Sequence, residues 1–191
     1  MRAANRPVAT QILVIRHAEK PALFGVPSGV DVNGEPHPHS LIVRGWQRAG
    51  ALVPFFCDLG DAAIHVPTRV FSPPSHGADG DHGRPYETVI ALADRIGVRV
   101  ETRFSLDEED ALVAAATGTA GVALIAWEHK RIPRIASGLL RDTKAAPKTW
   151  PDDRFDVVWV FDYDANTATY RFSQRPQLLL AGDRADPIGH A

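Results

Sequence analysis

Cysteine is almost absent from this chain, because Cys57 is the only one among 191 residues. A single cysteine excludes an internal disulfide framework and any zinc site built from several cysteines. A strong charge of one sign is also lacking, since 21 basic and 23 acidic residues leave a formal net charge of −2. This balance gives no support for binding to nucleic acid or to an anionic membrane. No long apolar run follows the N-terminus, which argues against a signal peptide or membrane anchor and favours a cytoplasmic protein.

The composition is that of a globular protein, with 45% hydrophobic and 23% charged residues. A length of 191 residues fits one domain of ordinary size and is sufficient to bury a core. No internal repeat, low-complexity tract or linker divides the chain. We therefore expect a single domain over residues 1–191.

Segments typical of strands and of helices alternate along the chain. Short apolar segments predict strands at 11–16, 68–72, 98–101 and 121–127, and amphipathic segments predict helices at 40–56, 86–96, 107–116 and 131–140. Two more strands, 155–163 and 167–173, flank a turn at Asp164-Ala165-Asn166. This order predicts a three-layer α/β/α sandwich with a mainly parallel central sheet and an antiparallel C-terminal strand pair. We expect the tail from Pro176 onward to be a loosely packed terminus.

The first predicted strand ends abruptly at Arg16-His17. In open α/β sheets, ligands bind at the carboxyl ends of the strands, so this pair lies where a ligand is expected. Arginine offers a planar donor fork matched to phosphate oxygens, and histidine is a nucleophile or proton carrier near neutral pH. The pair therefore indicates phosphate chemistry.

Two other segments present similar side chains after predicted strands. The strand at 68–72 leads through a polar loop to Arg84, at the start of a helix, and the strand at 121–127 is followed by Glu128 and His129. If these strands run parallel, their loops project from the same edge of the sheet. Arg16, His17, Arg84 and His129 are then expected to converge.

These residues and their order resemble the histidine phosphatase superfamily, which includes cofactor-dependent phosphoglycerate mutases and many small phosphatases. The resemblance covers about the first two-thirds of the chain. It rests on four segments: Arg16-His17-Ala18, similar to the family's Arg-His-Gly; 43–49, similar to its Thr-x-x-Gly-x-x-Gln-Ala helix; Ser72-Pro73 followed by Arg84 and Thr88, similar to its Ser-Pro and Arg-x-x-x-Thr; and His129 as its second strand-terminal histidine. Ala18 replaces the usual glycine, and the loop before Arg84 is longer than usual. Each motif alone is weak, but four in the same order are specific.

The resemblance implies a phosphomonoesterase that acts on a small phosphorylated substrate without a metal or other cofactor. His17 is expected to attack the phosphoryl group and to form a phosphohistidine intermediate. Arg16 and Arg84 are expected to bind the phosphoryl oxygens, and His129 to donate a further hydrogen bond. Nothing in the sequence indicates an oligomeric state.

The proton donor for the leaving group is open among three carboxylates. The family's donor follows the third strand, and Glu108 matches a Leu-x-Glu spacing within Leu106-Asp107-Glu108. Asp107 is the second candidate and Glu128, beside His129, the third. An acidic first helical turn is common in itself, so Asp107 and Glu108 are equally typical of a helix start.

Other functions remain open at this point. A phosphomutase uses the same pocket, and a phospho-ligand binding or regulatory module would keep the pocket without an effective proton donor. A metal-dependent hydrolase would need the loop histidines, whose irregular spacing fits no common metal site; they are His37, His39, His76 and His82. Arg44 and Arg48 are expected on a solvated helix face.

Overall fold

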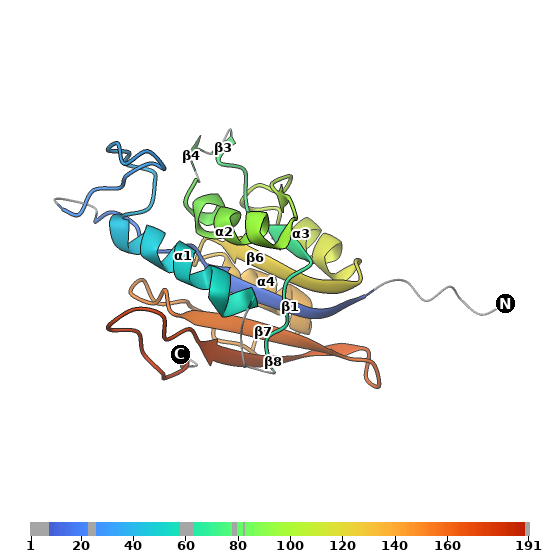
Figure 1. The fold of residues 1–191 in the computed structure, drawn as a ribbon. Coiled ribbons are helices and arrows are strands. Elements are labelled where there is room, and N and C mark those ends of the chain that lie inside the picture. Colours follow the sequence, from blue (N-terminus) through green and yellow to red (C-terminus); the bar gives the residue numbers. More distant parts are fainter. Residues whose placement is uncertain (1–7, 23–25, 58–62, 78–79, 82, 190–191) are drawn as a thin grey trace.

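The computed structural model describes residues 8–22, 26–57, 63–77, 80–81 and 83–189. Its sheet strands are β1 (Ala9–Arg16), β2 (Arg69–Phe71), β5 (Val100–Glu101), β6 (Gly121–Trp127), β7 (Val157–Asp164) and β8 (Thr169–Pro176). They form a six-stranded sheet in the order β5-β2-β6-β1-β7-β8 (Figure 1). The first four strands of this order run parallel, β7 is antiparallel to β1, and β8 is antiparallel to β7. The predicted mainly parallel sheet with an antiparallel C-terminal pair is confirmed.

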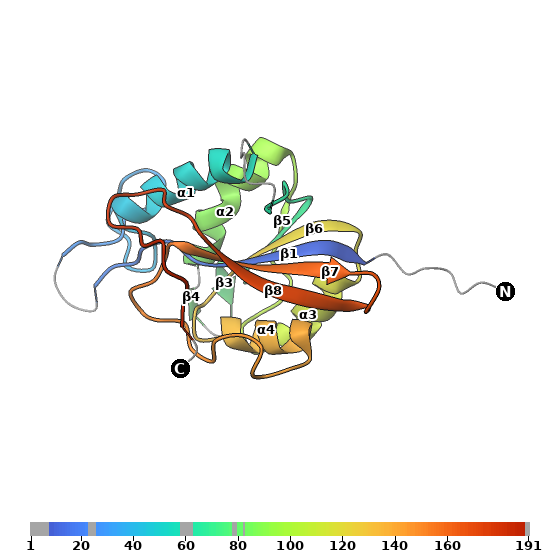
Figure 2. The ribbon, with the colours of Figure 1, turned by 90° about the horizontal axis from the view of Figure 1, so that it is seen from below.

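Helices cover both faces of this sheet. They are α1 (Val43–Cys57), α2 (Gly83–Ile96), α3 (Glu109–Thr117) and α4 (Ile132–Leu140). Figure 2 shows α1 and α2 on one face and α3 and α4 on the other. The predicted three-layer sandwich is thereby confirmed. A small hairpin, β3 (His76–Gly77) with β4 (Gly80–Asp81), lies between β2 and α2. Among the described residues, no helix has the length and apolar character needed to cross a membrane.

β1 is buried on both faces because it lies in the middle of the sheet. Ile12 and Val14 belong to the apolar cluster formed with α3 and α4, whereas Leu13 and Ile15 belong to the cluster formed with α1 and α2. All four side chains are fully buried. This explains why the segment reads as a continuous apolar run rather than an alternating one.

The register between β1 and β6 places the ends of both strands together. Arg16 is paired with Trp127, and the His17 N–H donates to the carbonyl oxygen of Trp127 at 3.2 Å. The residues that follow each strand, His17 on one and Glu128-His129 on the other, therefore leave the sheet side by side.

The expectation of a loosely packed tail after Pro176 is wrong. Gln177 and Ile188 are both 4% exposed, and Ile188 belongs to the core cluster formed with α3 and α4. The Ile188 N–H donates to Gln174 Oε1 at 2.9 Å, and Gln174 Nε2 donates back to the Ile188 carbonyl oxygen at 2.9 Å. The tail is held because one buried apolar side chain and paired polar groups dock it against β8.

Candidate active site

His17 directly follows β1, at the point where the chain leaves the sheet. It is 5% exposed, and its Nδ1 lies 2.7 Å from the carbonyl oxygen of Ala18. A carbonyl oxygen only accepts hydrogen bonds, so Nδ1 carries the proton of the neutral ring. Nε2 is then left with its lone pair, and it is the ring atom that can attack an electrophile.

The surroundings of His17 disfavour a positive charge on the ring. Burial lowers the pKa of His17 well below its usual value, and the charges of Arg16 and Arg84 lower it further. The hydrogen bond to Ala18 acts in the opposite direction but does not reverse the shift. A lowered pKa keeps the imidazole neutral near pH 7, which is the form that a nucleophile requires.

The Arg16 guanidinium is fixed on one side and free on the other. Its NH1 donates to the carbonyl oxygens of Pro151 (3.1 Å), Asp152 (2.7 Å) and Arg154 (3.2 Å), and its central carbon lies 3.9 Å from the centre of the Phe155 ring. Burial lowers the pKa of Arg16 to about 10, which still leaves it cationic at neutral pH. Nε and NH2 are buried and have no hydrogen-bond partner among the described residues. Buried donors are nearly always paired in folded proteins, so these two are suited to an anionic ligand.

Arg84 lies in the first turn of α2, and Thr88 fastens that turn to the end of β1. The Thr88 hydroxyl donates to the Arg84 carbonyl oxygen at 2.7 Å and accepts from the Ala18 N–H at 2.8 Å. The spacing Arg-x-x-x-Thr thus has a structural reason, because one helical turn separates the arginine from the residue that ties it to the nucleophile's loop. The Arg84 guanidinium makes no hydrogen bond or ion pair with the described residues, and burial lowers its pKa.

His129 lies beside His17, with 6.5 Å between ring centres and an angle of 84° between the rings. Its Nε2 is 2.5 Å from Asp152 Oδ1, and its Nδ1 is 2.8 Å from Glu128 Oε1. The first contact is a hydrogen bond, whereas the second has the distance of an ion pair without hydrogen-bond geometry. The ring is therefore held between two carboxylates.

These groups surround a small cavity of ≈ 30 Å³ at the carboxyl edge of the parallel strands. The lining residues are His17, Pro73, Arg84, Pro85, Leu106 and Glu128. Arg16 and His129 are electrostatic neighbours of His17 within the same site. The structure thus brings together the four basic residues that the parallel strands were expected to gather, including Arg84, which a long loop separates from β2.

The three candidate carboxylates lie in different environments. Glu128 lines the cavity with His17. Glu108 is exposed, its Oε2 accepts a hydrogen bond from the Ser105 N–H at 2.8 Å, and it is not among the lining residues. Asp107 is also exposed and pairs with Arg131. Only Glu128 is therefore within the cavity in the part of the chain that the structure describes.

Opposing effects act on the Glu128 carboxyl. Burial raises the pKa of Glu128, but the close interaction with the His129 ring and the contact with Lys130 outweigh it, and the net pKa lies below the usual value. Glu128 is therefore a carboxylate near neutral pH and becomes a proton donor only at acidic pH.

The expectation of a solvated Arg48 is wrong. Arg48 is 2% exposed, and its guanidinium donates to both oxygens of Glu19, which directly follows Ala18, and to Asp183 in the C-terminal tail. Arg44, whose side chain is 41% exposed, also pairs with Glu19, at 3.2 Å. This network fixes the segment after His17 against α1. Sequence reasoning also missed Asp152, because no motif marks an acidic residue in the loop before β7.

Of the four loop histidines, the structure describes the side chains of His37 and His39. Among the described residues, no group of three or more His, Cys, Asp or Glu side chains is arranged to hold a metal ion. The rings of His37 and His39 lie 6.0 Å apart. The side chains of His76 and His82 lie outside the described part of the structure.

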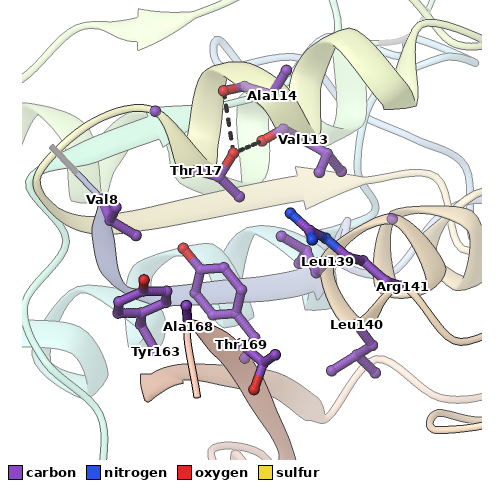
Figure 3. A pocket seen from close by; sticks show the side chains of 13 residues that line it. Val8, Val113, Ala114, Thr117, Leu139, Leu140, Arg141, Tyr163, Ala168 and Thr169 are labelled. Carbon is purple, nitrogen blue, oxygen red and sulfur yellow. Dashed lines mark hydrogen bonds between the residues drawn. The ribbon is translucent and has the colours of Figure 1, made fainter. Parts of the chain in front are cut away.

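Another hollow lies between α3, α4 and the β7–β8 hairpin (Figure 3). It has a volume of ≈ 800 Å³ and contains few groups with suitable chemistry. The Thr117 hydroxyl is bonded to the carbonyl oxygens of its own helix, and burial raises the pKa of Tyr170 to about 12. Without a nucleophile or a converging set of cations among its lining residues, this hollow does not compete with the cavity at His17 as a catalytic site.

No family model and no curated protein matches this chain. Solved structures with the same fold do match. A mycobacterial glucosyl-3-phosphoglycerate phosphatase in its native form gives a TM-score of 0.51 at 15% identity, and the match covers 87% of this chain and 97% of that one. A putative phosphohistidine phosphatase SixA from Nakamurella multipartitia gives a TM-score of 0.51 at 19% identity, covering 85% and 92%. At the level of the fold, the resemblance that the motifs indicated is confirmed.

Proposed function

We propose that this chain, which has the fold of the histidine phosphatases, is a phosphomonoesterase of that superfamily and works through a phosphohistidine on His17. One observation carries the proposal. A neutral His17 with a free Nε2 lone pair shares one site with Arg16, whose Nε and NH2 have no partner among the described residues, and with Arg84, whose guanidinium has none there either. Nucleophile and anion-binding donors are the two parts that phosphoryl transfer requires. The likeness to two phosphatases supports the same activity.

In the first step, His17 Nε2 attacks phosphorus while the bond to the ester oxygen breaks. The product is a phosphohistidine, and the proton on Nδ1 keeps its hydrogen bond to the Ala18 carbonyl oxygen. Arg16 Nε and NH2 and the Arg84 guanidinium bind the equatorial oxygens, where they stabilise charge without reorganising. Because the Asp152 side chain is 81% exposed, a phosphoryl oxygen can replace its carboxylate on His129 Nε2.

We assign the leaving-group proton to Glu128, the third of the sequence candidates, because it lines the cavity with His17 and Glu108 does not. The departing alkoxide takes the proton from the Glu128 carboxyl and leaves as an alcohol. In the second step, water attacks the phosphohistidine and passes a proton to the Glu128 carboxylate. Inorganic phosphate leaves, and His17 and Glu128 return to their starting states.

The activity itself is tested with p-nitrophenyl phosphate. We expect hydrolysis without added metal, unchanged by EDTA, and competitive inhibition by vanadate, which mimics the five-coordinate transition state. Loss of hydrolysis on EDTA treatment would instead support a metal-dependent hydrolase.

Glu128→Gln should lower kcat/KM by an amount that depends on how much the leaving group of the substrate needs a proton. At a pH below the lowered pKa of Glu128, we expect kcat/KM for an alkyl phosphate to fall by roughly 10²-fold or more, the usual contribution of a positioned general acid. The loss on p-nitrophenyl phosphate should be far smaller, because nitrophenolate hardly needs a proton. Steady-state kinetics on both esters measure the difference.

Glu108→Gln is the matched control for this variant. Its carboxylate is exposed and bonded to Ser105 N, so we expect both substrates to react as in the wild type. A leaving-group-dependent loss in Glu108→Gln, with an equal loss on both substrates in Glu128→Gln, would return the donor role to the residue that the family spacing indicated.

The pH dependence follows from the lowered pKa of Glu128. The wild-type advantage over Glu128→Gln on an alkyl phosphate requires the protonated carboxyl, so it should be largest at acidic pH. It should shrink by about tenfold per pH unit above that pKa, until the two enzymes converge. Protonation of His17 should not reduce the rate near neutral pH, because the pKa of His17 is also lowered. A ratio of the two kcat/KM values that stays constant from acidic to neutral pH would contradict the assignment.

A phospho-ligand binding module is the second candidate. The observation that favours it is the Glu128 pKa, since an ionised carboxylate beside the cavity cannot donate a proton at neutral pH. Such a module would bind phosphate and vanadate but would fail to hydrolyse alkyl phosphates even at acidic pH.

A further inference from the structure

A second cavity adjoins the one at His17. It has a volume of ≈ 510 Å³ and shares Arg84 with the smaller cavity, so the two meet at that guanidinium. Its lining residues are Lys20, Pro21, Ala22, Ser28, Gly29, Pro36, His37, Pro38, His39 and Arg84. A phosphomonoester with its phosphoryl group at His17 therefore has room for its alcohol part along the segment that follows β1.

Hydrogen bonds to α2 hold the residues around His37 in place in the wall of the second cavity. Glu87 on α2 accepts hydrogen bonds from the Ser40 hydroxyl at 2.6 Å and from the Leu41 N–H at 2.9 Å. The Ser40 hydroxyl has a single proton, which it donates to Glu87, so its contact with His37 Nδ1 at 3.0 Å makes that nitrogen the donor. The His37 ring is thereby oriented, and Nε2 of the neutral ring is left as a hydrogen-bond acceptor.

The charge of the second cavity has one sign. Lys20 and Arg84 are its charged lining residues, and no carboxylate is among its described lining residues. Lys20 is half-buried and makes no hydrogen bond or ion pair with the described residues. The acidic groups that act on it, Asp152 and Glu128, belong to the phosphoryl site. A partly buried lysine without an internal partner is available to pair with an anionic ligand.

A third cavity, of ≈ 440 Å³, shares His37 with the second cavity but differs from it in charge. It too is lined by His37 and His39, but it contains the carboxylates Asp31 and Glu87. The unpaired cation Lys20 lines only the cavity that adjoins the phosphoryl site. The second cavity, next to the reaction centre, is therefore cationic, whereas the third contains carboxylates.

We infer that the substrate of this site is a phosphomonoester with a second anionic group on its alcohol part, a carboxylate or a second phosphate, which Lys20 binds beside Arg84. This inference rests on the proposed phosphatase function. It adds a substrate class, because neutral and cationic phosphomonoesters leave the Lys20 ammonium unpaired. A flexible ammonium stem suits an anion whose position differs from one substrate to another.

The test compares esters that differ only in the charge of their far end. They are ω-carboxyalkyl phosphates with one to four methylene groups, the neutral alkyl phosphates of equal length, the ω-aminoalkyl phosphates and the α,ω-alkanediol bisphosphates. For the wild type we expect kcat/KM to favour the best carboxylate or bisphosphate over its neutral match by about tenfold or more, as for a charged hydrogen bond. The carboxylate and bisphosphate arms decide which anion is preferred.

Variants at position 20 separate charge from structure. Lys20→Arg should retain the preference, Lys20→Met should bring the ratio of charged to neutral ester close to one, and Lys20→Glu should invert it in favour of the aminoalkyl phosphates. Each ratio is taken within one variant, so a general loss of activity cancels. An altered fold would not reverse the selectivity.

The outcomes are distinguishable. If the wild type hydrolyses none of these esters and no p-nitrophenyl phosphate, the proposed function fails. If it hydrolyses them with a charged-to-neutral ratio near one, or if Lys20→Met keeps the wild-type preference, the phosphatase stands and the anionic subsite is overturned.

Discussion

Alanine in place of His17 is expected to lower kcat on every phosphomonoester by about 10³-fold or more, because the nucleophile of a two-step transfer has no substitute. The fold should persist. His17 lies at the end of β1 and outside the apolar clusters, so we expect its loss to change the free energy of unfolding by about 1 kcal/mol. Steady-state kinetics and urea unfolding measure the two effects separately.

His65→Ala is the matched control, since His65 is exposed and is not among the residues that line the cavity. It should keep wild-type kcat and stability. Near wild-type turnover in His17→Ala would end the mechanism proposed here, whatever the behaviour of the other variants.

Replacing Arg84 with alanine has the second largest expected effect, on anion binding. Loss of a charged hydrogen bond should weaken phosphate or vanadate binding by about 1.5–3 kcal/mol, which is roughly 10- to 150-fold in Kd. Calorimetry, or the phosphate concentration needed to raise Tm, measures this loss. Without ligand, Tm should not fall, because the Arg84 guanidinium has no partner to lose among the described residues.

Two controls accompany this variant. Arg95→Ala removes an exposed arginine from the last turn of the same helix and should leave phosphate affinity unchanged. Arg84→Lys keeps the charge but not the planar fork, and it should recover only part of the affinity. Equal phosphate affinities in Arg84→Ala and the wild type would remove Arg84 from the phosphoryl site and leave Arg16 as its main anion donor.

The strand ends could be predicted from the sequence because their information is local. An apolar run that stops at Arg16-His17 marks the end of its strand directly. The apolar run that ends at Trp127 does the same, and it places Glu128 and His129 after the strand. The position of Arg84 was harder, because a long loop intervenes between β2 and α2. The spacing to Thr88 nevertheless identified it, since that threonine ties the helix start to Ala18.

Pairing between distant segments could not be predicted in the same way. Arg48 is buried because it pairs with the carboxylates of Glu19 and Asp183. Glu19 lies 29 positions before it and Asp183 lies 135 positions after it, so the pattern of the helix does not reveal either partner. The tail after Pro176 is ordered for the same reason. Helix α1 begins at Val43 rather than Ser40, since Glu87 on another helix takes the Ser40 hydroxyl and the Leu41 N–H.

The proton donor shows where a family spacing is insufficient. The Leu-x-Glu spacing predicted Glu108. In the structure, Asp107 has a φ of 77° in the turn before α3, and the Glu108 carboxylate accepts a hydrogen bond from the Ser105 N–H. Leu106 is the residue of that segment that reaches the cavity. Glu128 carries no family motif. Its relevance follows from its place beside His17 across the β1–β6 pair.

The most direct test of the phosphohistidine is to trap it. Wild-type enzyme is mixed with ³²P-labelled substrate and quenched in alkali, which preserves phosphohistidine, and the labelled peptide is sequenced by mass spectrometry. We predict a phosphate adduct on His17 at its imidazole Nε2, formed within the first turnover and absent from His17→Ala. Full turnover with no labelled protein at any quench time, or a label on a residue other than His17, would contradict the mechanism.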